Sequence, residues 1–172
     1  MKKLLPFLAL AIFAVCHVHA EDIKFTVGEF SFKAEAPWTE SQNAGMMTSK
    51  VLAFPVKDSK PLEAKFYFFS GGGGGVEANV KRWIGQFEPT PEVKQEELPF
   101  ADGKVILLTA TGTFLDGAMM SPTKTPHAGY TLLGAIVVGK DAPVFIKLTG
   151  PKADTDAAKD AFKKLVTSPF GK

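Results

Sequence analysis

The sequence predicts an α+β fold in which a mainly antiparallel sheet carries two covering helices. Three observations lead to this prediction. Most of the expected strands follow one another through short turns, so hairpin pairing should dominate. Two segments, Val76–Phe87 and Asp154–Val166, instead repeat apolar residues with helical spacing. The helices follow runs of strands, which is the order expected when helices cover an antiparallel sheet.

The first twenty residues have the features of a secretory signal peptide. Lys2 and Lys3 precede a short apolar run, and Val18-His19-Ala20 places small residues at positions −3 and −1 of a cleavage site. The apolar run is too short for a transmembrane helix, which needs ~20 residues. We therefore expect cleavage after Ala20 and no membrane span.

A periplasmic or extracellular location follows from this signal, with residues 21–172 as a single α+β domain. A lipoprotein anchor on Cys16 is an alternative that stays open. That motif requires a small residue directly before the cysteine and a leucine-like residue at −3, whereas Phe13-Ala14-Val15 stands there.

Loss of the predicted signal peptide changes the composition of the chain, and the remaining composition excludes several classes of function. It leaves 18 basic and 18 acidic residues, so the net charge is zero and no basic field remains to hold nucleic acid. It also removes the only cysteine and leaves His127 as the only histidine. Thiolate chemistry and multi-histidine metal sites are thereby excluded. We predict no catalytic residue, no metal and no cofactor.

The N-terminal half should be built from strands. Ile23–Val27 and Phe30–Lys33 alternate apolar and polar residues around a Gly28-Glu29 turn, which is typical of a hairpin. Thr39–Gly45 is expected to be a loop. Met47–Val56 and Glu63–Phe69 are the next two strands, and consecutive aromatic residues in the latter indicate burial on both faces.

The helix predicted over Val76–Phe87 has one apolar stripe, in which Trp83 is the largest side chain. Its predicted stripe consists of Val76, Val80, Trp83, Ile84 and Phe87.

The C-terminal half should contain four strands and the closing helix. The expected strands are Glu92–Leu98, Lys104–Phe114, Tyr130–Val138 and Pro143–Thr149. Asp116–Ala128, which contains two prolines, is expected to be a polar loop. Phe162 should lie on the buried face of the helix Asp154–Val166. We expect a single sheet with both helices packed on it and with Trp83 and Phe162 buried.

Several of these features resemble a known family. A short N-terminal hairpin, the turn Ala36-Pro37-Trp38 and a last strand that runs through Gly150-Pro151 into the closing helix look like the PsbP-like fold. That fold occurs in an extrinsic photosystem subunit and in a nuclear-transport cofactor. Gly72–Trp83 and Phe145–Pro151 also resemble uncharacterised exported proteins of planctomycete and verrucomicrobial type. The resemblance implies a PsbP-like sandwich with a binding role and assigns no catalytic residue.

Five consecutive glycines separate an aromatic strand from the first helix and form a candidate binding loop. They are Gly71, Gly72, Gly73, Gly74 and Gly75. The run lacks the lysine and the hydroxyl residue of a phosphate-binding loop, and it does not fit a dinucleotide fingerprint. Two interpretations stay open: a loop that a partner approaches closely, or a slack connector. In the first case, Gly73→Val should abolish binding and leave folding nearly intact, unless φ is positive there.

The loop predicted after Asp116 supplies a second candidate surface. Met119 and Met120 are adjacent, and flexible thioethers suit adaptable contact surfaces, although one methionine tucked under the loop is the simpler interpretation. His127 is a further candidate contact residue in the same segment.

These observations predict a noncatalytic exported domain that binds a partner protein or a small ligand through its loops. The alternative is a cofactor-free hydrolase that uses carboxylates. An enzyme of that kind should have a concave pocket with two convergent acidic residues, whereas a partner-binding domain should have a shallow apolar patch.

Overall fold

The structure, a computed structural model, describes residues 21–43, 45, 47–117, 121 and 123–171, so the predicted signal peptide and Cys16 lie outside the described residues. Within these residues the strands are β1 (Ile23–Val27), β2 (Phe30–Ala34), β3 (Thr39–Glu40), β4 (Lys50–Phe54), β5 (Leu62–Phe68), β6 (Glu92–Phe100), β7 (Gly103–Asp116), β8 (Thr125–Val138) and β9 (Val144–Pro151). The helices are η1 (Gly72–Gly74), α1 (Gly75–Ile84), α2 (Lys152–Thr167) and η2 (Ser168–Phe170), where η marks a single 3₁₀ turn.

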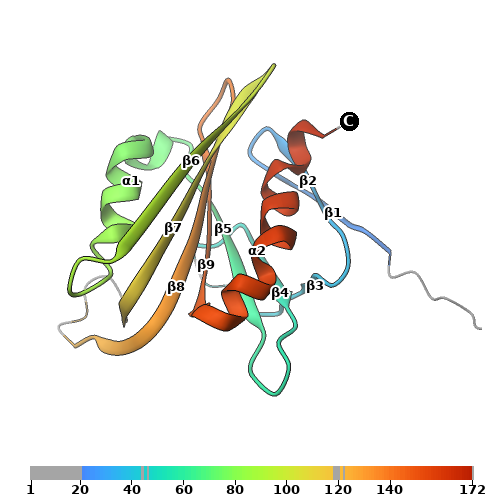
Figure 1. Cartoon of the computed structure of the whole chain (residues 1–172). Helices are drawn as coiled ribbons and strands as arrows, with labels where there is room; N and C mark the ends of the chain where they lie inside the picture. Colours follow the sequence, from blue (N-terminus) through green and yellow to red (C-terminus); the bar gives the residue numbers. More distant parts are fainter. Residues whose placement is uncertain (1–20, 44, 46, 118–120, 122, 172) are drawn as a thin grey trace, which may run out of the picture.

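Seven strands form one antiparallel sheet in the order β3-β4-β5-β9-β8-β7-β6. α1 lies on one face of this sheet, and α2 lies on the other face together with β1 and β2 (Figure 1). Adjacent residues of β8 show the two faces, because Leu132 packs with Trp83 of α1 and Leu133 packs with Phe162 of α2. The predicted mainly antiparallel sheet with two covering helices is confirmed.

The expectation of a single sheet is wrong, because β1 and β2 form a separate two-stranded sheet. Side-chain packing holds this hairpin in place. Phe32 of β2 meets Phe66 of β5 edge-on, with 5.2 Å between ring centroids, and Phe30 meets Phe170 of η2 at 5.8 Å. The hairpin therefore buries its apolar face against the large sheet and does not extend an edge of that sheet.

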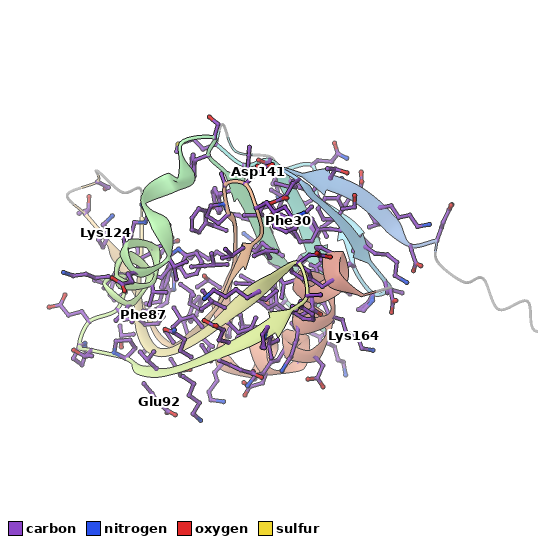
Figure 2. All side chains as sticks on the ribbon, turned by 90° about the horizontal axis from the view of Figure 1, so that it is seen from above. Phe30, Phe87, Glu92, Lys124, Asp141 and Lys164 are labelled. Atoms are coloured by element: carbon purple, nitrogen blue, oxygen red, sulfur yellow. The ribbon has the colours of Figure 1, made fainter. Side chains whose placement is uncertain are left out.

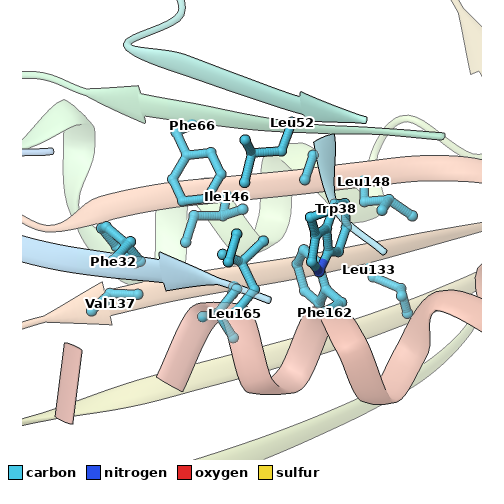
Figure 3. Close-up of a cluster of buried hydrophobic side chains, with 14 of the residues drawn as sticks. Phe32, Trp38, Leu52, Phe66, Leu133, Val137, Ile146, Leu148, Phe162 and Leu165 are labelled. Carbon is cyan, nitrogen blue, oxygen red and sulfur yellow. The ribbon is translucent and has the colours of Figure 1, made fainter. Parts of the chain in front are cut away.

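The core on the α2 side is aliphatic and aromatic throughout. Figure 3 shows Phe162 and Leu165 of α2 directed toward side chains of the sheet, among them Ile146 and Leu148 of β9. Trp38, which follows β2, closes one end of this core, and its indole Nε1 donates a hydrogen bond to the carbonyl oxygen of Ala161, 3.4 Å away. The predicted burial of Phe162 is confirmed, since it is 3% exposed.

The core on the α1 side centres on Trp83, which is 6% exposed, so its predicted burial is also confirmed. The indole lies directly over Gly134 of β8, where an added β-carbon would stand 2.5 Å from the ring. Phe87 and Phe114 extend this core edge-on, with 5.4 Å between ring centroids. In the view from above, Phe87 lies on the α1 side of the molecule and Lys164 of α2 on the other side (Figure 2).

Several boundaries differ from expectation, and one is that of β4, which spans Lys50–Phe54 and not Met47–Val56. α1 ends at Ile84 and not at Phe87, because the backbone of Phe87 forms an isolated antiparallel bridge with Phe114 of β7. Thr39 and Glu40, expected in a loop, form the short strand β3, which pairs with β4.

The prediction of a loop over Asp116–Ala128 is wrong at both ends. β7 continues to Asp116 and β8 begins at Thr125, and these two residues face each other in the ladder. β8 pairs with β9 only from Tyr130 onward, so the first residues of β8 extend past the edge of β9. Pro126 fits there because a proline without an N–H is tolerated on a strand with a free side.

Candidate functional site

α1 covers only part of its face of the sheet, because it has 10 residues whereas β7 and β8 have 14 each. Two adjoining cavities lie on this face beside the helix. The polar cavity, of about 730 Å³, is lined by ionisable side chains from four strands, including Glu63, Lys65, Asp116, His127 and Lys147. The aromatic cavity, of about 450 Å³, lies against α1, and its lining includes Tyr67, Phe69, Arg82, Trp83, Phe145 and Lys147. Tyr67 and Lys147 line both cavities.

Strand alternation brings these side chains to one face. Glu63, Lys65 and Tyr67 are alternate residues of β5 and therefore point to the same side of the sheet. Lys147 of β9 stands directly opposite Lys65 in the antiparallel register, with its side chain on that side too. Like charges directly opposite each other are unfavourable, and the Glu63 carboxylate, 3.2 Å from Lys65 Nζ, compensates one of the two.

Lys147 is the least solvated of the charged side chains here. Its Nζ donates a hydrogen bond to Gln86 Oε1, 2.6 Å away, and lies 5.0 Å from the centroid of the Phe114 ring. Burial lowers the pKa of the Lys147 amine to about 8; Asp116 raises it in part, and Lys65 lowers it further. In the described part of the chain, Lys147 makes no ion pair with a carboxylate.

Glu63 is held as a carboxylate by its neighbours. Asn43 Nδ2 donates to Glu63 Oε1 over 2.8 Å, Ser41 Oγ donates to the same oxygen over 3.2 Å, and Lys65 Nζ lies 3.2 Å from Oε2. Burial alone raises the pKa of the Glu63 carboxyl, but the hydrogen bonds from Asn43 and Lys65 outweigh it, so the pKa lies below its ordinary value. Burial raises the pKa of Tyr67, whose hydroxyl therefore stays protonated at neutral pH.

The five glycines form a defined bend. Gly72, Gly73, Gly74 and Gly75 all have φ between +58° and +87°, a region that side-chain-bearing residues rarely adopt. The amide of Asn79 fastens this bend, because its Nδ2 donates to the carbonyl oxygens of Gly73 at 2.9 Å and Gly75 at 2.6 Å. Backbone geometry alone thus requires glycine at four positions. None of the five lines either cavity, and ligand or partner contact at Gly71–Gly75 stays a prediction.

Of the other predicted site residues, the structure brings His127 to the polar cavity. His127 lies on β8, not in a loop, and its ring stacks on that of Tyr130 with 4.7 Å between centroids. Met119 and Met120 lie outside the described residues.

Sequence reasoning missed Lys147 and Tyr67, although the sequence contains a signal for Lys147. Lys147 is the only charged residue in the run Val144–Leu148 of an otherwise apolar strand. A lysine in such a strand costs free energy because its charge is desolvated, so this position was as strong a candidate for a functional site as the glycines. Tyr67 carried no comparable signal, because an aromatic residue in a strand is ordinary.

No family model and no curated protein sequence matches the chain. Among solved structures, cyanobacterial PsbP (CyanoP) from Synechocystis sp. PCC 6803 is similar to it, with a TM-score of 0.53 and 12% sequence identity over 92% of this chain and 96% of that one. The chain has a PsbP-like fold. A protein of unknown function from Pseudomonas aeruginosa aligns over 84% of this chain and 92% of its own, with 13% identity and a TM-score of 0.45.

Among the described residues, no helix is long and apolar enough to cross a bilayer. Nor do three His, Cys, Asp or Glu side chains gather there as a protein metal site would require.

The buried amine makes a prediction about stability. Because folding lowers the pKa of Lys147 from 10.5 to about 8, the unfolded chain binds more protons between these two values, and stability should rise with pH across this window. Lys147→Met removes the cost of the buried charge and loses one hydrogen bond. The variant should therefore be more stable than the wild type by about 1–2 kcal/mol at pH 7. The difference should shrink toward pH 10.5.

Urea unfolding at pH 7 and at pH 10 measures this difference. Lys159→Met, on the exposed face of α2, is the control and should change stability by less than ~0.5 kcal/mol at either pH. A Lys147→Met variant that is less stable at pH 7 would contradict the assignment of a desolvated amine.

Proposed function

We propose that this chain is a noncatalytic exported domain that binds a small ligand in the polar and aromatic cavities beside α1. The observation that carries the proposal is Lys147, a half-buried lysine at the wall shared by both cavities, whose pKa is lowered by burial to about 8. Its burial costs free energy, and ionisable groups with strongly shifted pKa values cluster at functional sites. A bound ligand would supply the interactions that the described residues do not provide.

The size and lining of the cavities support this proposal. Sites for small molecules typically enclose about 300–1,000 Å³ and combine apolar walls with a few polar groups that converge. The cavities here, of about 450 and 730 Å³, are lined in part by aromatic side chains; Tyr67 and Lys147 line both, and His127 lines the polar one. This concave surface fits a small-ligand site better than it fits a partner-binding domain, for which a shallow apolar patch is expected.

Two further parts of the proposal rest on the sequence. Export rests on the signal peptide predicted over residues 1–20, with anchoring at Cys16 as the alternative, and on the resemblance to exported proteins of planctomycete and verrucomicrobial type. Contact with a partner protein through Gly71–Gly75 or through Met119 and Met120 also rests on the sequence.

A carboxylate hydrolase is the weaker candidate. Glu63 and Asp116 do line the same polar cavity, as such an enzyme would require. A general acid, however, needs a raised pKa, and the pKa of Glu63 is lowered. Three side chains donate to or pair with the Glu63 carboxylate, which favours a structural role for it.

A thermal-shift screen tests the proposed function. The library should contain organic acids, amines and neutral sugars and nucleosides in equal numbers. A true ligand at about 100 times its Kd adds ~2.7 kcal/mol of stability and should raise Tm by roughly 5–10 °C. That rise should disappear in Tyr67→Trp, which fills the space between the cavities, and in Lys147→Met.

Lys159→Met serves as the control and should keep the full rise in Tm, because Lys159 lies on α2 at the other face of the sheet. If no library compound gives a rise that depends on Tyr67 or Lys147, the proposed function is wrong.

A further inference from the structure

The aromatic cavity has an uneven distribution of charge. Its walls carry three cationic side chains, Arg82, Lys124 and Lys147, and no carboxylate among the described residues that line it. In the polar cavity, by contrast, Glu63 and Asp116 stand beside Lys60, Lys65 and Lys147. Lys124 lies beside α1 in the view from above (Figure 2). Negative charge is therefore favoured in the aromatic cavity and opposed in part of the polar one.

Aromatic side chains make up much of the remaining lining of this cavity, and Asn79 and Gln86 also contribute polar side chains to it. Trp83 comes from α1, Phe69 directly follows β5, Phe145 comes from β9, and Tyr67 is shared with the polar cavity. Aromatic faces of this kind accommodate a planar ring by offset or edge-on packing. Tyr67 and Lys147 line both this cavity and the polar one.

Met47 gives an independent indication that an apolar group binds here. Its side chain also lines the aromatic cavity, yet 66% of it is exposed. Among the described residues the only other exposed large apolar side chain is Val93 on the edge strand β6, and it is 38% exposed. An exposed methionine beside a concave aromatic surface is typical of an adaptable contact with an apolar ligand.

We infer that the aromatic cavity binds a small organic anion with a planar apolar body. The anionic group lies against Lys147 and Arg82, and the ring lies on Phe69, Trp83 and Phe145 beneath Met47. This inference rests on the proposed function and narrows it to one class of ligand. A single negative charge fits best, because Asp116 and Glu63 lie beyond Lys147 and repel a second one.

Two fluorescent probes of nearly equal shape test the inference. 8-Anilinonaphthalene-1-sulfonate carries one sulfonate, and N-phenyl-1-naphthylamine is the same ring system without the charge. The sulfonate should bind with 1:1 stoichiometry and at least about tenfold more tightly than the neutral probe, since a hydrogen bond to a charged group is worth ~1.5–3 kcal/mol. Acetate alone, which lacks the ring, should not compete at millimolar concentration.

Matched variants locate the binding. Arg82→Gln and Lys147→Met should each weaken the sulfonate probe about tenfold and leave the neutral probe unchanged. Lys81→Gln removes a neighbouring cation from the other side of α1 and should change neither. An unchanged near-ultraviolet circular dichroism spectrum shows that each variant is folded, since this sulfonate also binds molten globules.

The outcomes separate this inference from the proposed function. Equal affinity for the two probes overturns the inference. So does an affinity for the sulfonate probe that is unchanged in both Arg82→Gln and Lys147→Met. Failure of both probes to bind overturns it as well. If the library screen finds Lys147-dependent ligands that are neutral or cationic, the proposed function holds and the anionic class is wrong.

Discussion

Trp83→Ala is expected to lower the free energy of unfolding by about 3–5 kcal/mol, the usual cost of deleting a large aromatic side chain from a core. Trp83 is buried between α1 and the sheet, and its ring occupies the space over Gly134, where an added β-carbon would stand 2.5 Å from it. Its removal opens a cavity under the helix and loses the main contact that holds α1 on this face.

Urea unfolding followed by fluorescence measures this loss, because Trp38 remains as a reporter on the opposite side of the sheet. Lys81→Ala, on the exposed side of the same helix, should stay within ~0.5 kcal/mol of the wild type. A measured loss below ~1 kcal/mol for Trp83→Ala would place α1 outside the core and contradict the arrangement of the layers.

Gly73→Val should destabilise the chain by about 2–5 kcal/mol. The φ of Gly73 is +58°, and a left-handed conformation costs an ordinary residue ~1–2 kcal/mol. A β-carbon there would also stand 2.9 Å from Phe69 and 3.0 Å from Phe145, so the valine overpacks this side of the core for a further ~1–3 kcal/mol. This replaces the expectation that the substitution leaves folding nearly intact, which held only for a negative φ.

Gly71 provides the matched control within the same run. Its φ is −86°, and an added β-carbon would meet no atom within 4 Å. Gly71→Val should therefore be nearly neutral, and Gly71→Ala should stabilise by ~0.4–1 kcal/mol through the unfolded state. Equal effects at Gly71 and Gly73 would contradict the bend described here and favour a slack connector.

The elements with a strong local pattern were predicted well. The alternation of Ile23–Val27 and Phe30–Lys33 and the stripe that contains Phe162 depend only on side-chain periodicity, which neighbouring residues set by themselves. The start of β8 was missed for the opposite reason. Proline and glycine, here Pro126 and Gly129, are typical of loops. A strand is possible there because the first residues of β8 pair with β7 on one side only, before the pairing with β9 begins at Tyr130.

The candidate site was predicted least well, because its residues meet only in the folded chain. His127 was the one predicted contact residue that the structure brings to a cavity. Lys147 went unnoticed, since its significance depends on burial and on a neighbour, Gln86, that is 61 positions away in the sequence.

The sequence by itself determined the α+β class and the positions of most strands and both helices, because periodicity and turn residues act over a few neighbouring positions. The tertiary structure alone decided which face each helix covers, that β1 and β2 stand apart from the large sheet, and that Lys147 lies at the wall shared by two cavities. Those features depend on contacts between distant segments, and the pKa of a group depends on how far such contacts remove it from water.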